Sequence, residues 1–203
     1  RLPEAVDDWV IASDPASQPA QSGAVDAART LTRQVNALHA TYATARQEAQ
    51  DAVVAGVATA NGALRQIGVL SARIVQDRAL GHSTADLENQ RDAAKASLAG
   101  LIDARFVEQP GGDLLVATGN GIALPTRFDS DPLTVDDATL DASATYPGGA
   151  VPAVKLRGAD VTAGLGSGTL GANLALRDTV LPGMQAELDE FAHTLSTRFD
   201  DQG

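Results

Sequence analysis

The sequence predicts an α+β protein in which a coiled-coil-like bundle of long helices carries a small inserted β domain. Apolar residues recur every three or four positions from residue 23 to residue 76, as they do on one face of a helix. After Ile102 the period falls towards two and turn residues become frequent, which is typical of short strands. The helical period returns at Thr169. We therefore expect two helical regions that share one core, with β structure between them.

A long helix is predicted over residues 23–76, with Ser22 as its N-cap. A helix of that length is on the order of 80 Å long, which suits a bundle or a filament component better than a small compact domain. The apolar residues form a stripe along one face of this helix. The spacing of the stripe shifts by one residue at Val53, and this indicates a stutter in one continuous helix. The stripe consists of Ala28, Leu31, Val35, Leu38, Tyr42, Ala45, Ala49 and Ala52, followed by Val53, Val57, Ala60, Leu64, Ile67 and Ile74.

A short amphipathic helix is predicted before the long one, over residues 2–10. The segment that follows it, SDPASQPAQSG, contains two prolines and Gly23, so we expect a turn there. The chain begins with Arg1 and not with Met, and we expect it to be a piece of a longer protein.

A second helix is predicted over residues 84–102, where Ser83 and Asp86 have the spacing of a capping box. Strands are expected next in a β-meander, at ARFVEQ, LLVATG and IALPT, because PGGD and Asn120-Gly121 between them are turn sequences. A further strand is expected at AVKLRG, and the acidic stretch FDSDPLTVDDATLD predicts loops.

The returning helix is predicted from Thr169 onwards and should pack along the first helix. Pro182 lies inside it, and its ring would clash with the carbonyl of Asp178, so we expect a kink or a restarted first turn. The predicted domains are a helical bundle of residues 1–103 plus 169–203 and an inserted β domain of residues 104–168. The apolar stripe of the returning helix consists of Leu170, Leu174, Arg177, Leu181, Met184, Leu188, Phe191 and Leu195.

The candidate structural site consists of two Arg-Asp pairs, Arg91-Asp92 and Arg177-Asp178. Each arginine falls on the apolar stripe of its helix, where an unpaired charge would be costly. We expect both arginines to be at least half buried beside a carboxylate or a helix-end carbonyl. The candidate carboxylates are those of Glu88, Asp92 and Asp178. Their expected role is to fix the packing register of the bundle.

Charge and composition exclude several functions. The chain has 26 acidic and 15 basic residues and a net charge of -11, so we expect no nucleic-acid partner and no membrane partner. It contains no cysteine, which excludes disulfides and thiolate metal sites. There is no G-x-S-x-G nucleophile motif, and the three histidines lack metal-ligand spacing. We predict no catalytic, cofactor-binding or metal-binding residues, and no enzyme activity.

Two other patterns have some features of binding sites. The segment GSGTLG at residues 166–171 fits a dinucleotide fingerprint, but a second strand with an acidic residue does not follow it, so we interpret it as a hinge before the helix. The acids from Asp129 to Asp141 lack the spacing of a calcium loop and are interpreted as a solvated acidic loop.

Several segments, taken in order, resemble a known family. They are WVIASDPAS, RTLTRQVNAL, DLENQRDAAKASLAGLIDARFVEQPGGDLLVATGNGIAL and GTLGANLALRDTVLPGMQAELDEFAHTL. Together they resemble the hook-associated protein 1 family of the bacterial flagellum, the hook–filament junction proteins, of which this chain would be a central fragment. The two Arg-Asp elements and the G-N-G hairpin carry most of this likeness.

The resemblance implies an extracellular structural adaptor that the flagellar type III apparatus exports and that joins hook to filament. Its implied partners are the hook protein, other hook-associated proteins and copies of itself in the full-length chain. The polymerising terminal helices of the family are missing, so we expect the 203-residue fragment to be monomeric. The alternatives are a flagellin-like filament paralogue and a coiled-coil sensory or binding module.

Overall fold

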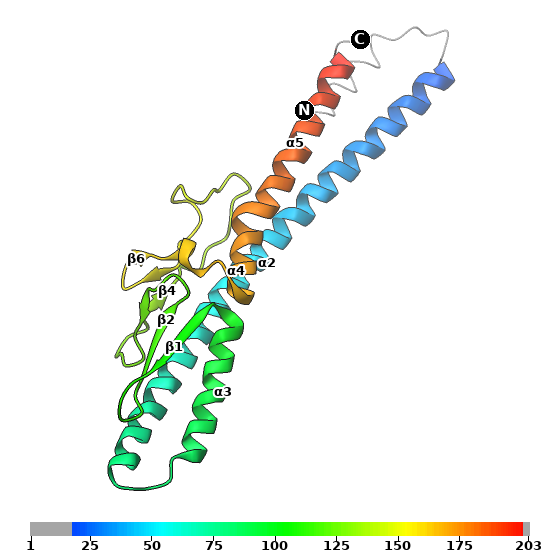
Figure 1. Ribbon diagram of the computed structural model, residues 1–203. Coiled ribbons are helices and arrows are strands. Elements are labelled where there is room, and N and C mark those ends of the chain that lie inside the picture. The colour runs from blue at the N-terminus through cyan, green and yellow to red at the C-terminus, as the bar shows by residue number, and fades with distance from the viewer. Residues whose placement is uncertain (1–17, 201–203) are drawn as a thin grey trace. The chain divides into compact units, whose positions relative to one another are not determined.

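The computed structural model describes residues 18–200 (Figure 1). The helix predicted over residues 2–10 lies outside the described residues. The chain divides into two compact units, which we treat separately: unit 1 comprises residues 1–46 and 180–203, and unit 2 comprises residues 47–179. Helix α2 (Gln18–Ala79) is continuous and contributes to both units.

Unit 1 contains a pair of helices. The first part of α2 lies beside α5 (Leu181–Asp200), and the two run in opposite directions (Figure 1). His39 Nε2 of α2 lies 3.9 Å from Asp189 Oδ1 of α5. The prediction that α2 starts after Ser22 is wrong, because the helix already begins at Gln18 and includes Pro19. Proline is tolerated there since the first turn of a helix needs no N–H donors for internal bonds.

The apolar stripes of unit 1 are only partly buried. Leu38 of α2 is 40% exposed, and Met184 and Phe191 of α5 are 43% and 49% exposed. Leu181 is buried on α5, and so is the polar Gln185. The prediction that Leu38, Met184 and Phe191 belong to the buried stripe is therefore wrong. Two helices that meet along one line cover only a narrow strip of each surface.

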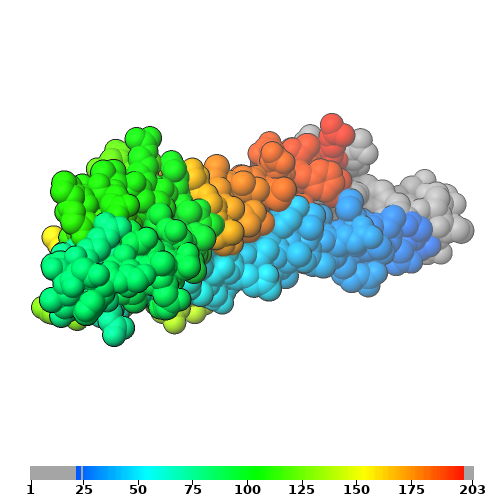
Figure 2. Space-filling model, turned by 60° about the horizontal axis from the view of Figure 1, so that its bottom comes forward, coloured from blue at the N-terminus to red at the C-terminus, as the bar shows by residue number. Residues whose placement is uncertain are grey.

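Unit 2 combines the rest of α2 with helices and two small sheets. Helix α3 (Ala85–Leu101) follows the turn after the end of α2, and it lies against the C-terminal part of α2 (Figure 2). The helical elements are α3 (Ala85–Leu101), the 3₁₀ helix η2 (Thr162–Leu165), α4 (Gly168–Ala175) and the π-helical segment η3 (Leu176–Val180), whose last residue belongs to unit 1. The strands are β1 (Ala104–Glu108), β2 (Leu114–Thr118), β3 (Ala123–Leu124), β4 (Leu133–Thr134), β5 (Lys155–Leu156) and β6 (Ala159–Asp160).

Both sheets of unit 2 are antiparallel. The first has the order β1-β2-β3, as predicted for the meander, and Val116 pairs with Phe106 on one side and Leu124 on the other. The second has the order β4-β5-β6, with Leu156 between Leu133 and Ala159. The strand expected at AVKLRG is present as β5.

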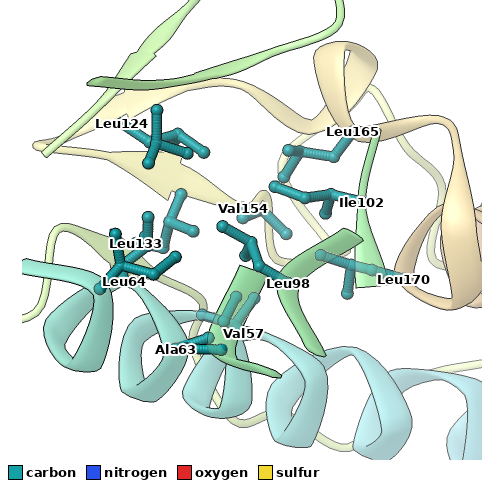
Figure 3. Close-up of a cluster of buried hydrophobic side chains, with 14 of the residues drawn as sticks. Val57, Ala63, Leu64, Leu98, Ile102, Leu124, Leu133, Val154, Leu165 and Leu170 are labelled. Carbon is teal, nitrogen blue, oxygen red and sulfur yellow. The ribbon is translucent and has the colours of Figure 1, made fainter. Parts of the chain in front are cut away.

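The hydrophobic core of unit 2 lies where α2, α3, α4 and both sheets meet (Figure 3). The predicted α2 stripe from Val53 to Ile74 is confirmed, since each of its six members is at most 4% exposed. Leu98 of α3 and Leu170 of α4 pack in the same cluster, together with Leu133 of β4. The separate β domain of residues 104–168 stays a prediction, while the described strands share this core with the helices. The predicted α+β fold class is confirmed.

The returning helix is interrupted just before Pro182. The π-helical segment η3 lies between α4 and α5, and α5 begins at Leu181, so that Pro182 lies in a restarted first turn, as predicted. Proline at position 182 cannot donate to the carbonyl of Asp178, and a wider turn accommodates its ring.

The start of α3 also differs from the prediction. Its N-cap residue is Thr84, and the predicted capping box of Ser83 and Asp86 is wrong. The Thr84 hydroxyl instead donates to Glu88 Oε1 at 2.5 Å.

Within α2, Val25–Ala79 contains an 18-residue stretch with a mean hydropathy of 1.3, which is apolar enough to cross a membrane. Of that stretch, 56% is buried inside the structure. Buried core helices of globular proteins have the same composition.

Candidate functional site

Buried polar side chains in unit 2 form the candidate site, and they are centred on Arg91 and Arg177. Arg91 is 4% exposed and Arg177 is fully buried. Among the described residues, no group of three or more His, Asp or Glu side chains could hold a metal ion. The contacts of these two arginines define the site.

Arg91 connects α3 to the turn between β1 and β2. Its Nη1 donates to the carbonyl oxygen of Gly112 at 2.6 Å, and its Nη2 lies 3.7 Å from Glu108 Oε1. Ser71 Oγ of α2 lies at the edge of hydrogen-bond distance, 3.5 Å from Nη1. A turn carbonyl that accepts from a buried guanidinium is fixed in place, because leaving either group unpaired is costly.

Gly112 allows the β1–β2 turn to approach α2 closely. Its φ is +100°, which favours glycine, and a Cβ built there would lie 2.9 Å from Ile74 Cγ2. This close approach also brings the turn within reach of Arg91 and Arg78. The PGGD turn is thus a docking element as well as a hairpin loop.

Arg78 joins three elements around the Arg91 site. It binds Glu88 Oε1 of α3 at 2.9 Å and Glu108 Oε1 of β1 at 3.2 Å. The hydrogen bond from Thr84, with that from Arg78, lowers the pKa of the Glu88 carboxyl. The bonds to the two glutamates raise the pKa of Arg78 in turn. The bonds of Arg78 are partly exposed, so they add less to stability than the buried contacts of Arg91.

Asp92 does not hydrogen-bond to Arg91 in the structure. It accepts from Lys95 Nζ at 2.8 Å, and this bond lowers the pKa of its carboxyl. Adjacent residues on a helix point about 100° apart, so Asp92 faces solvent while Arg91 faces the core. Of the three candidate carboxylates for the two arginines, only Asp178 makes a direct hydrogen bond.

Arg177 connects η3 to the middle of α2. Its Nε and Nη2 donate to the two carboxylate oxygens of Asp178 at 2.7 and 2.9 Å, and its Nη1 donates to Gln50 Oε1 at 2.7 Å. Gln50 in turn donates from Nε2 to the carbonyl oxygen of Asp136 at 3.0 Å. One continuous chain of bonds therefore joins η3, α2 and the segment after β4.

Three amide side chains of α2 were not predicted, and they bind the acidic stretch by its backbone. Asn61 accepts from Leu133 N–H at 3.2 Å and donates to Leu133 C=O at 2.8 Å. Gln47 accepts from Leu140 N–H at 2.8 Å and donates to Ala138 C=O at 3.2 Å. The sequence does contain a signal for these contacts. Gln47, Gln50 and Asn61 lie beside the apolar stripe, at positions where a surface helix would carry charged residues.

The acidic stretch is therefore anchored along α2 and is not simply a solvated loop. Asp131 also pairs with Arg65 of α2 at 2.6 Å. Gly68 of α2 completes the docking, because a Cβ there would lie 1.9 Å from the carbonyl oxygen of Thr126. Gly68 is therefore a site of close backbone approach.

The GSGTLG segment, residues 166–171, has a packing role in the structure. Gly168 begins α4 with a φ of +71°, and a Cβ there would lie 2.4 Å from the carbonyl oxygen of Leu101. Gly171 packs on the backbone of Gly166. These glycines let the start of α4 contact the end of α3.

Buried arginines and amides attach the meander and the second small sheet to the long helix. This arrangement defines a structural helical module. The comparisons agree with this class. A model of the family described as flagellar hook-associated protein FlgK helical domain matches residues 8–203. The chain therefore belongs to the FlgK helical-domain family.

A solved structure shows the same fold. The flagellar hook junction protein FlgK from Burkholderia pseudomallei matches with a TM-score of 0.61 and 21% sequence identity. The match covers 92% of this chain and 35% of that protein, so the chain spans about a third of its length. The comparison with curated proteins gave no significant match.

Proposed function

We propose that this chain is the helical core of a hook–filament junction subunit and acts there as a non-enzymatic structural adaptor. The family match over residues 8–203 carries the proposal. The architecture supports it, because the buried arginines and amides of unit 2 fix secondary-structure elements to one another. Within the proposal, the full-length protein contacts hook protein, another hook-associated protein and copies of itself.

The proposed location is outside the cell, in the flagellum, after export by the flagellar type III apparatus. Within this proposal, Arg91-Asp92 and Arg177-Asp178 have structural roles: Arg91 fixes the β1–β2 turn and Arg177 fixes η3. The division into an inner helical domain and an outer β domain is part of the same proposal.

The test is genetic and uses the full-length parent protein. In the bacterium that encodes it, a deletion of the parent gene should leave hooks without filaments, and the intact gene should restore swimming. A parent protein whose Arg177 and Gln50 are both changed to Ala should be exported but should restore fewer filaments, counted by electron microscopy. Normal filaments in the deletion strain would contradict the proposed function.

We also propose that assembly depends chiefly on segments of the parent protein beyond these 203 residues. Copies of a chain with a net charge of -11 repel one another at close approach. The chain itself should therefore be mainly monomeric at micromolar concentration, and light scattering measures this directly. A tight, salt-resistant oligomer would contradict this part of the proposal.

A further inference from the structure

The outer face of the first sheet in unit 2 is apolar where an antiparallel sheet normally presents polar residues to water. Val107 of β1 and Leu115 of β2 pair directly across the strands, and they are 55% and 58% exposed. A groove of about 490 Å³ includes both side chains, and its lining continues through Ala123 and Pro125 to Leu156. We call this surface the β groove. Exposed apolar surfaces of this kind mark interaction sites.

Two arginines at the β groove give it a positive charge. Arg157 is part of its lining, and Arg105 lies two residues from Val107 on the same face of β1, opposite Ala117. Neither guanidinium has an ion-pair partner among the residues whose side chains the structure describes. In a chain with 26 acidic and 15 basic residues, two unpaired arginines beside an apolar groove favour an acidic, apolar partner.

The backbone at Arg157 is a second indication that its side chain is needed. Arg157 and Gly158 form the two-residue turn between β5 and β6, with φ values of +50° and +87°. Such a turn favours Asn or Asp in its first position, and an arginine there is strained. Local folding alone therefore does not explain the arginine.

Helix α5 has the complementary surface. Met184 and Phe191 are exposed on it, and Glu187 lies between them on the same side of the helix. The two apolar side chains are seven residues apart, or about 10.5 Å along the helix. The three strands of the first sheet span about 10 Å, since neighbouring strands lie about 4.8 Å apart.

We infer that the β groove of one subunit binds the α5 face of a second copy, with Met184 and Phe191 in the groove and Glu187 beside Arg157. The inference rests on the proposed structural role and names one subunit contact within it. Because the groove and the α5 face are different surfaces of the same chain, the contact is heterologous and repeats from subunit to subunit. The contact is weak for the isolated chain and becomes significant at the high effective concentration within an assembly.

Cysteine cross-linking between two separately purified chains tests the contact, since the natural sequence has no cysteine. Ala123→Cys places a thiol in the groove, and Thr194→Cys places one on α5 a turn after Phe191. Mixed at high micromolar concentration with a short bis-maleimide, this pair should form the mixed dimer about tenfold faster than a control pair. The control replaces Ala123→Cys with Ala72→Cys, an exposed position on α2 outside the groove.

A second variant tests the charge. Arg157→Asn removes the guanidinium and suits the turn better, so the variant should remain folded. It should slow the cross-link several-fold in the test pair and leave the control pair unchanged. Equal rates for the two pairs, or a test rate that Arg157→Asn leaves unchanged, would overturn the inference. Cross-linking without restored filaments in the genetic test would contradict only the proposed function.

Discussion

The two parts of α2 have apolar stripes of similar period, but they bury them to different extents. In unit 2, the stripe from Val53 to Ile74 is at most 4% exposed at each of its six positions. In unit 1, Leu31 and Val35 are only partly buried, and Leu38 is 40% exposed. A periodic pattern thus identifies the apolar face of a helix, but the burial of that face depends on how many elements pack against it.

The number of packing partners explains this difference. In unit 2 the stripe is covered by α3, α4 and strands of both sheets, which contribute to one cluster. In the described part of unit 1, α5 is the helix beside it. Unit 1 therefore keeps apolar side chains such as Met184 and Phe191 at its surface, and these are the residues that we assign to a subunit contact.

Truncation of one leucine in each unit should show the largest difference. Leu64→Ala removes a fully buried side chain from the core of unit 2, and it should lower the free energy of unfolding by about 4 kcal/mol. Leu38→Ala should cost less than about 1 kcal/mol, because its side chain already contacts water. Urea unfolding followed by circular dichroism measures both. Similar costs for the two variants would show that unit 1 is as tightly packed as unit 2.

The next largest effect concerns the buried Arg177. Asp178→Ala leaves that guanidinium without its bidentate partner, and it should destabilise the chain by about 3 kcal/mol. Arg177→Met removes the charge and leaves a shorter, unbranched apolar side chain in the core, so it should cost less. Thermal melting of both variants gives the comparison. If both variants melt at the same temperature, the guanidinium retains enough partners without Asp178.

The sequence predicted the elements that have strong local signals. The meander was predictable because PGGD and Asn120-Gly121 mark its two turns, and the helices because their stripes are long. The strands β4 and β6 have two residues each and no detectable period. The position of β4 follows from contacts of Leu133 with Asn61 and the core, which the local sequence does not contain. The position of β6 follows from its pairing with β5.

For the candidate site, burial of the arginines was predictable but most of their partners were not. An arginine on an apolar stripe must be buried or bend towards water, and both arginines are buried. The acceptors Gly112 and Gln50 lie 21 and 127 residues away from Arg91 and Arg177 in the chain. Only the fold brings them together, whereas Asp178 was predictable as an immediate neighbour.

A substitution of Gln185 in unit 1 should raise the stability of the chain, whereas Leu64→Ala and Asp178→Ala should lower it by larger amounts. Gln185 is 5% exposed, and neither its Nε2 nor its Oε1 has a hydrogen-bond partner among the described residues. Gln185→Leu should therefore stabilise the chain by about 1 kcal/mol, because it replaces an unsatisfied amide with an apolar side chain of similar size. The exposed Gln66→Leu is the control and should have little effect. A lower melting temperature for Gln185→Leu would show that the amide has a partner in solution.

The smallest effect is a change in one pKa at the start of α3 in unit 2. The Thr84 hydroxyl is the main cause that lowers the pKa of Glu88, with Arg78 next. A carboxyl whose pKa is lower in the folded state stabilises that state above its unfolded pKa, and the contribution is lost as the pH falls through the folded pKa. Thr84→Val should raise the pKa of Glu88 towards its ordinary value of 4.5, as measured by NMR titration of the carboxyl carbon. The melting temperatures of the natural chain and Thr84→Val should accordingly differ most near neutral pH and converge below pH 4.5.

Ser83→Ala is the control and should leave the Glu88 titration unchanged, because Thr84 is the N-cap and binds Glu88. A shifted Glu88 titration in Ser83→Ala, with none in Thr84→Val, would instead assign the cap to Ser83 in solution.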